Sequence, residues 1–130
     1  MEIQRRVQAK IHAEHCGELP VGQAIVVATD HARFPFLVVA PTMRVPDRIA
    51  DTVNVYLAFR AALLAVLRHN SSGKNSIESL HSPALGTGVG AMPFDRAARQ
   101  MAAAYESIFG RPSWRNDPAR ILVHHENLRS

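Results

Sequence analysis

The feature of this sequence that most constrains its fold is a glycine-rich segment at residues 85–90, Leu-Gly-Thr-Gly-Val-Gly. Patterns of apolar residues predict a strand before this segment and a helix after it. Gly86, Gly88 and Gly90 leave out side chains where the backbone must turn and where a ligand could approach. Successive N–H groups in such a turn can form a concave anion site, and the start of the following helix adds partial positive charge. The segment therefore predicts either a phosphate site or a turn that needs glycine only for its geometry.

Two familiar phosphate-binding motifs do not fit this segment. A P-loop requires Gly-Lys-Ser/Thr at its end, and no such tripeptide follows Gly90. A dinucleotide-binding fingerprint requires two residues between its second and third glycines, whereas Val89 alone separates Gly88 from Gly90. The residues of the segment leave both the phosphate site and the structural turn open.

The rest of the chain alternates helical and extended patterns, which is typical of a layered α/β domain. Apolar residues that recur every three or four positions predict helices at residues 2–15, 52–69 and 95–108. Continuous apolar runs predict strands buried on both faces at residues 24–28 and 36–40, and further strands are expected at residues 76–82 and 120–124.

Length and composition set the size and class of the protein. The 130 residues correspond to about one domain, so we expect a single domain over residues 1–130. Fifteen Lys and Arg against 11 Asp and Glu give a net charge of +4, which modestly favours anionic partners. The basic residues are not clustered, so no dedicated nucleic-acid-binding surface is expected. No apolar run has the length of a membrane span or of a signal peptide. The single cysteine, Cys16, excludes an intramolecular disulfide and fits a cytoplasmic location.

Three small groups of reactive side chains support only weak hypotheses. His12 and His15 lie on one helix face and could share a metal, but no third ligand is suggested, so we expect no metal and no cofactor. Cys16 follows His15, yet it lies at the C-terminal end of a helix, where the dipole does not favour a thiolate. Asp30 and His31 could form an acid–base pair, but adjacency in sequence does not orient a base. We therefore expect surface or loop roles for all three groups.

The C-terminal region offers two further candidates. In the predicted strand at residues 120–124, the neighbouring His124 and His125 would point to opposite faces, so they would not share a metal. Trp114 could stack on the ring of a ligand, but we expect it to anchor the C-terminal segment instead.

Three ordered segments resemble the macro domain family. Residues 83–90, Pro-Ala-Leu-Gly-Thr-Gly-Val-Gly, precede an alanine-rich helix with Arg-Ala-Ala-Arg-Gln-Met at residues 96–101, as in the second half of a macro domain. Residues 17–24, Gly-Glu-Leu-Pro-Val-Gly-Gln-Ala, resemble the segment that leads into a middle strand. Residues 56–63, Tyr-Leu-Ala-Phe-Arg-Ala-Ala-Leu, resemble the helix that precedes the strand of the glycine loop.

The resemblance covers about residues 2–110 and leaves residues 111–130 as a C-terminal extension. It implies a three-layer α/β fold in which a sheet is flanked by helices, and a module that binds ADP-ribose or a related nucleotide diphosphate. In the family, backbone amides of the glycine-rich loop wrap the diphosphate. The resemblance assigns this ligand-binding role to Gly86, Thr87, Gly88, Val89 and Gly90, with the Thr87 hydroxyl as a further contact.

The resemblance also shows what this sequence lacks. Macro domains have an earlier strand that ends in an Asn-Ala-Ala-Asn-like motif and then a second glycine-rich loop, and nothing similar precedes Glu2. We therefore expect an N-terminally shortened fold that binds its ligand without catalysis. One alternative is an ADP-ribosyl hydrolase, which would require a longer native N-terminus. Another is a structural or interaction domain that keeps only the fold and binds no nucleotide.

A shortened sheet would leave apolar surface uncovered and one strand edge unpaired, and such an edge can pair with another chain. We therefore predict a two-fold homodimer, since this is the commonest closed symmetry. In the alternative, the predicted strand with Ile-Leu-Val at residues 121–123 folds back and fills the gap within one chain.

Overall fold

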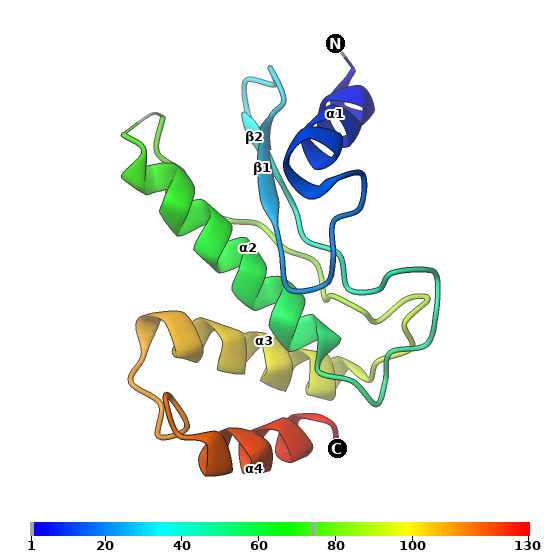
Figure 1. Ribbon diagram of the computed structural model, residues 1–130, viewed down its shortest axis with the longest axis vertical. Helices are drawn as coiled ribbons and strands as arrows, with labels where there is room; N and C mark the ends of the chain where they lie inside the picture. Colours follow the sequence, from blue (N-terminus) through cyan, green and yellow to red (C-terminus); the bar gives the residue numbers. More distant parts are fainter. Residues whose placement is uncertain (1, 74) are drawn as a thin grey trace.

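The computed structural model describes residues 2–73 and 75–130, which form helices and a two-stranded antiparallel sheet (Figure 1). The sheet lies between α1 and α2, while α3 lies on the far side of α2 and α4 packs on α3. This order confirms the predicted α/β class, in which helices flank a sheet. The elements are α1 (Ile3–His15), β1 (Ile25–Ala28), β2 (Phe36–Val39), α2 (Asn54–Ser71), α3 (Phe94–Phe109) and α4 (Pro118–Leu128).

The three helices with clear apolar periodicity form where the sequence predicts them. α1 ends where Cys16 (φ 52°) and Gly17 (φ 93°) take left-handed conformations, which glycine adopts without steric cost. At the start of α2, the Thr52 hydroxyl oxygen accepts a hydrogen bond from the backbone N–H of Asn54 (3.1 Å). This contact satisfies one of the N–H groups that a helix start leaves without an intrahelical partner.

Helix α1 covers the outer edge of the sheet with two cationic side chains. The Lys10 Nζ donates to the carbonyl of Val26 (2.7 Å), and the Arg6 guanidinium donates to the carbonyl of Ala28 (2.9 Å). Both carbonyls belong to β1, whose other edge pairs with β2. Because an open strand edge exposes unpaired backbone groups, these contacts protect β1 from pairing with another chain.

The prediction that both strands are buried on both faces is wrong. In β1, Ile25 and Val27 are buried whereas Ala28 is exposed, and in β2 Leu37 is 40% exposed. The sheet packs on α2 with both strands, whereas α1 packs mainly on β1, so part of the sheet meets solvent.

The predicted strand at residues 76–82 is also wrong. Among the described residues, no strand pairs with this segment, which has no regular secondary structure and lines a cavity together with β2. Its contact with the rest of the chain is made by a side chain: Asn70 accepts from the Ile77 N–H (2.7 Å) and donates to the Ile77 carbonyl (2.9 Å). The Asn70 amide thus takes the place that a neighbouring strand would occupy.

The predicted C-terminal strand at residues 120–124 is wrong as well, because these residues belong to α4. Asp117 accepts a hydrogen bond from the backbone N–H of Arg120 (3.3 Å), and Pro118 occupies the first turn, where its missing N–H costs nothing. Leu128 packs with Val53 and Ala103 in a core cluster between the start of α2, α3 and α4. The fold-back of residues 121–123 into the sheet is therefore ruled out.

Small side chains hold the helices of the core close together. The buried faces of α2 and α3 are formed largely by alanines, which allow the two helix backbones to approach. A second core cluster joins Ile49 and Val55 to Met92 and Ala97, directly beneath the glycine-rich segment. The buried alanines are Ala58, Ala61, Ala62, Ala97, Ala103 and Ala104.

The fully buried Gln100 of α3 links three helices. Its Oε1 accepts from the backbone N–H of Tyr56 (3.1 Å), in the first turn of α2. Its Nε2 donates to the carbonyls of Thr52 (2.8 Å) and Leu128 (2.9 Å), which lie at the start of α2 and the end of α4. One side-chain amide therefore satisfies backbone groups at two helix ends that are shielded from water.

We predict that Gln100→Met lowers the free energy of unfolding by about 3 kcal/mol, because methionine keeps the volume but leaves three shielded backbone groups without partners. Chemical denaturation followed by circular dichroism measures the change. Gln4→Met is the matched control, since Gln4 is exposed on α1. Equal stabilities of the two variants would show that Gln100 does not hold the helix ends.

Candidate functional site

The glycine-rich segment forms a tight loop that lies on the core and leads into α3. The carbonyl of Gly86 accepts from the N–H of Met92 (2.9 Å), and the carbonyl of Gly88 accepts from the N–H of Ala91 (3.0 Å). The carbonyl of Gly90 accepts from the N–H of Ile49 (2.8 Å), which ties the loop to the segment before α2. All three glycine carbonyls are therefore engaged within the protein.

Two of the three glycines are required by packing. Gly86 has φ 71°, and a Cβ there would lie 2.7 Å from Val55 Cγ2. A Cβ on Gly90 would lie 2.6 Å from the Gly86 carbonyl oxygen and 2.6 Å from Ile49 Cγ1. Gly88 differs, because a Cβ there meets no atom within 4 Å. Gly86 and Gly90 thus shape the loop, while Gly88 lies at its open side.

Three backbone N–H groups of the loop face no acceptor in the described part of the chain. None of the described residues accepts a hydrogen bond from the N–H groups of Gly88, Val89 and Gly90, in contrast to the carbonyls of the same loop. Gly88 and Val89 are exposed, Val89 by 70%. The arrangement can donate several backbone hydrogen bonds to an anion that approaches from solvent.

Thr87 does not add the hydroxyl donor that the sequence suggested. Its Oγ1 donates to the carbonyl of Ala84 (2.8 Å), so the hydroxyl hydrogen is used within the loop. A phosphate oxygen needs a donor, and the Thr87 hydroxyl is not free to supply one.

The start of α3 adds to the positive character of this region. α3 begins at Phe94, four positions after Gly90, and no side chain caps its first turn. The unpaired N–H groups of a helix start carry a partial positive charge, which favours anions nearby. Loop and helix start are continuous in the chain, so both lie at the same end of α3 (Figure 1).

The structure does not bring the other reactive side chains into a catalytic or metal site. Asp30 forms an ion pair with Arg6, and this hydrogen bond holds the pKa of the Asp30 carboxyl below its usual value. His31 Nδ1 instead accepts from the backbone N–H groups of Arg33 (3.2 Å) and Phe34 (3.1 Å), so it shapes the turn between the strands. Asp30 and His31 therefore bond to different partners and do not act as a pair.

The histidines and the cysteine of α1 also remain apart from any metal site. His12 and Cys16 are exposed, and His15 is half-buried. No group of three or more His, Cys, Asp or Glu side chains within residues 2–73 and 75–130 is arranged to hold a metal ion. Within the same residues, no helix combines the length and the apolar character that crossing a bilayer requires.

Trp114 anchors the C-terminal segment, as the sequence analysis predicts. Its ring stacks on His124 of α4, with 3.8 Å between ring centroids and 10° between planes. His124 and His125 are neighbours on a helix rather than on a strand, so the prediction that they point to opposite faces of a strand is wrong. Both histidines line one cavity with Trp114, which the sequence analysis missed.

Comparisons with known proteins support the resemblance seen in the sequence. Residues 2–101 match the family model described as Macro domain. An uncharacterized protein of Aeropyrum pernix is 33% identical over 93 residues, which cover 72% of this chain and 46% of that protein. An uncharacterized protein of Aquifex aeolicus is 34% identical over 83 residues, which cover 64% of this chain and 47% of that protein. The chain spans about half the length of these curated relatives, and no solved structure matches it.

The packing of the loop predicts a sharp difference between two neighbouring glycines. We expect Gly90→Ala to lower the free energy of unfolding by about 2 kcal/mol, because the new methyl group overlaps a backbone oxygen and Ile49. Gly88→Ala has open space and should stay within about 0.5 kcal/mol of the unchanged protein. Thermal denaturation of both variants measures the contrast. If Gly88→Ala proves as destabilising as Gly90→Ala, the loop is packed differently from this description.

Proposed function

Because the chain belongs to the macro domain family, we propose that its loop of residues 86–90 binds the diphosphate of ADP-ribose or of a related nucleotide. Macro domains generally bind ligands of this class. The observation that carries the proposal is that the backbone N–H groups of Gly88, Val89 and Gly90 donate to none of the described residues, and that Gly88 and Val89 are exposed. A diphosphate has several oxygen acceptors and a negative charge, so it can satisfy such a run of donors.

The two kinds of glycine in the loop support this role. Gly86 and Gly90 hold the backbone against Ile49 and Val55, which fixes the directions of the N–H groups before a ligand arrives. Gly88 has no neighbour that a Cβ would meet, so a phosphate group can approach the backbone closely on that side. Binding to a loop held in this way costs little conformational entropy.

We propose binding rather than hydrolysis as the role of this loop. Residues 86–90 are Gly, Thr, Gly, Val and Gly, so the loop has no carboxylate, imidazole or amine that could transfer a proton. The Thr87 hydroxyl donates to Ala84 and has no base as its partner. The loop offers hydrogen-bond donors for a ligand and no nucleophile–base pair for its cleavage.

We predict that Gly88→Glu weakens ADP-ribose binding about tenfold or more, because a carboxylate beside the diphosphate repels it. The fold should be retained, since the new Cβ meets open space. Isothermal titration calorimetry measures the affinity, and circular dichroism checks the fold.

Leu122→Glu is the matched control for added charge, because Leu122 is 64% exposed on α4 and lies outside the loop. It should bind ADP-ribose as the unchanged protein does. The proposal fails if the unchanged protein gives no heat and no thermal shift with about 1 mM ADP-ribose. It also fails if Gly88→Glu binds as tightly as Leu122→Glu.

We also propose that two copies of the chain associate through the free edge of β2. The N–H of Thr29 donates to the carbonyl of Pro35 (2.9 Å), so these two residues form a hydrogen-bonded pair. Along two antiparallel strands, hydrogen-bonded residue pairs alternate with non-bonded pairs, whose backbone groups point away from the partner strand. Leu37 is thus bonded to β1, while the backbone groups of Phe36 and Val38 point to the opposite edge. That edge opens into a cavity of about 470 Å3 whose other wall is the unpaired segment 76–81.

The dimer predicts a mass of about twice 14.3 kDa in size-exclusion chromatography with light scattering, at tens of micromolar protein. Leu37→Lys should shift the protein toward the monomer, because a lysine beside an edge strand disfavours pairing with another chain. Leu122→Lys, on α4, should leave the mass unchanged. A monomer under these conditions, or equal masses of the two variants, would reject association through β2.

A further inference from the structure

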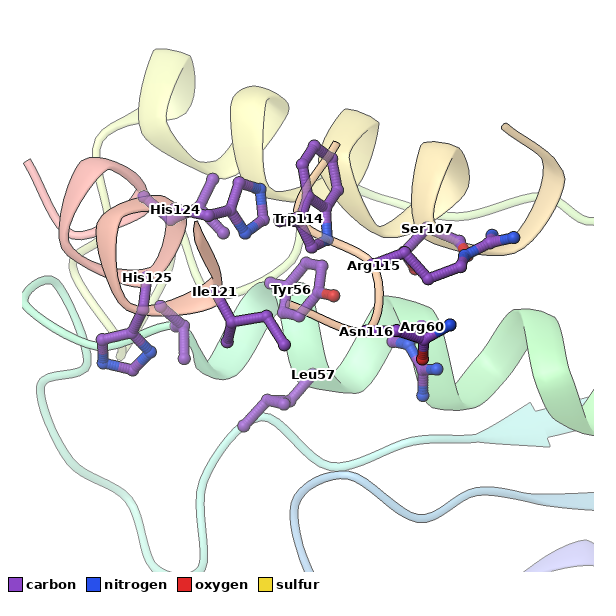
Figure 2. Close-up of a pocket in the computed structure, with 12 residues that line it drawn as sticks. Tyr56, Leu57, Arg60, Ser107, Trp114, Arg115, Asn116, Ile121, His124 and His125 are labelled. Atoms are coloured by element: carbon purple, nitrogen blue, oxygen red, sulfur yellow. The ribbon is translucent and has the colours of Figure 1, made fainter. Parts of the chain in front are cut away.

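A second cavity, separate from the glycine-rich loop, lies between α2, the connection from α3 to α4, and α4 itself (Figure 2). Its volume is about 410 Å3, which suits a small organic molecule. Leu57 of α2 and Ile121 and Leu128 of α4 supply aliphatic surface. Residues 107–128 supply more than half of the lining residues and lie beyond the part of the chain that matches the family model.

Three aromatic rings form the centre of this cavity. Trp114 stacks on His124, and Tyr56 meets the same imidazole edge-on, with 5.7 Å between ring centroids. Burial lowers the pKa of His124, which favours the neutral imidazole against the indole. Figure 2 shows the rings of Tyr56, Trp114 and His124 together, with Ile121 beside them. The cavity can therefore take a flat apolar group.

The only guanidinium groups among the described lining residues of the cavity belong to Arg60 and Arg115. None of the described lining residues is an aspartate or a glutamate. The Arg115 guanidinium donates to the carbonyl of Ser107 and is held in place by that contact. In Figure 2, Arg60 and Arg115 lie toward one end of the view and His125 toward the other. One end of the cavity is therefore rich in guanidinium groups.

Of the two arginines that line the cavity, Arg60 has no partner among the described residues. It is half-buried on α2, and no described residue accepts a hydrogen bond from it or forms an ion pair with it. A guanidinium in a partly buried site usually pairs with an anion, because its planar donors match a carboxylate or a phosphate. Arg60 therefore favours a ligand with a negative group, and the apolar, ring-lined cavity beside it favours a ligand with an apolar body.

We propose that this cavity binds a small anion with a flat apolar body, its negative group on Arg60 and its ring beside Trp114. Aromatic carboxylates and aryl phosphate esters share this chemistry. The charge complementarity is specific, since the described lining offers cations and no carboxylate, while Leu57 and Ile121 cover the body of the ligand. Nothing in this site uses residues 86–90, so it is independent of the proposed nucleotide site.

Fluorescence gives a direct readout, because Trp114 is the only tryptophan in the chain and lies in the cavity. Benzoate and phenyl phosphate serve as probes for the two sources of the anion, and benzyl alcohol serves as the uncharged control. We expect a saturable change in Trp114 fluorescence with at least one of the two anions and none with benzyl alcohol. The proposal is overturned if neither anion gives a saturable change at about 10 mM.

Variants separate this site from general charge effects. Arg60→Gln should weaken binding of the anion about tenfold, the loss expected when a charge-assisted hydrogen bond is removed. Arg48→Gln, at an exposed arginine outside the cavity, should bind as the unchanged protein does. Equal affinities of these two variants would overturn the assignment of Arg60.

Two further variants keep the test decisive. If Arg60→Gln does not fold, Ile121→Glu places a carboxylate at the cavity on a side chain that is 46% exposed, and it should weaken the same anion about tenfold. Unchanged affinity in Ile121→Glu would overturn the site. Gly88→Glu should leave the fluorescence titration unchanged, and a loss there would place the anion at residues 86–90 instead.

Discussion

The hydrogen bonds of the Gln100 side chain are the contacts on which both candidate sites depend. This one amide joins the start of α2 to α3 and to the end of α4. The position of α2 places Val55 and the preceding Ile49 under the glycine-rich loop, where they define its backbone. The position of α4 brings His124 against Trp114 and closes the second cavity. A buried polar group that satisfies two helix ends therefore sets the geometry of surfaces on opposite sides of α3.

The two edges of the sheet differ in whether their outward backbone groups have hydrogen-bond partners. On β1, the ammonium of Lys10 and the guanidinium of Arg6 donate hydrogen bonds to outward carbonyls. These carbonyls are therefore not available to another strand. On β2, no described residue takes that role for Phe36 and Val38, and the nearest segment, residues 76–81, keeps a cavity between itself and the strand. Of the two edges, that of β2 is therefore the one whose backbone groups have no partner among the described residues.

The predictions from the sequence were correct for the elements that a clear pattern of apolar residues marks. Helices α1, α2 and α3 were predicted from the periodicity of their apolar residues, and strands β1 and β2 from continuous apolar runs. The prediction of a strand was wrong for the apolar run Ile121, Leu122 and Val123. All three side chains are largely exposed, so this run does not mark a buried segment. Asp117 followed by Pro118 was the informative signal, because a cap and a first-turn proline begin a helix. The glycine spacing predicted the loop, but the cavity at Trp114 could not be predicted once α4 was taken for a strand.

Helix α3 contributes backbone groups to both candidate sites. Its N-terminal end, beside the glycine-rich loop, carries a partial positive charge, which the Asp95 carboxylate in the first turn offsets in part. Its C-terminal turn has free carbonyls, and the Ser107 carbonyl accepts from the Arg115 guanidinium, so part of that positive charge is already matched within the protein. Arg60, on α2, has no such acceptor among the described residues, which leaves it as the cation available to a ligand. Since residues 86–90 are absent from the lining of the second cavity, ligands at the two sites do not compete for the same donors.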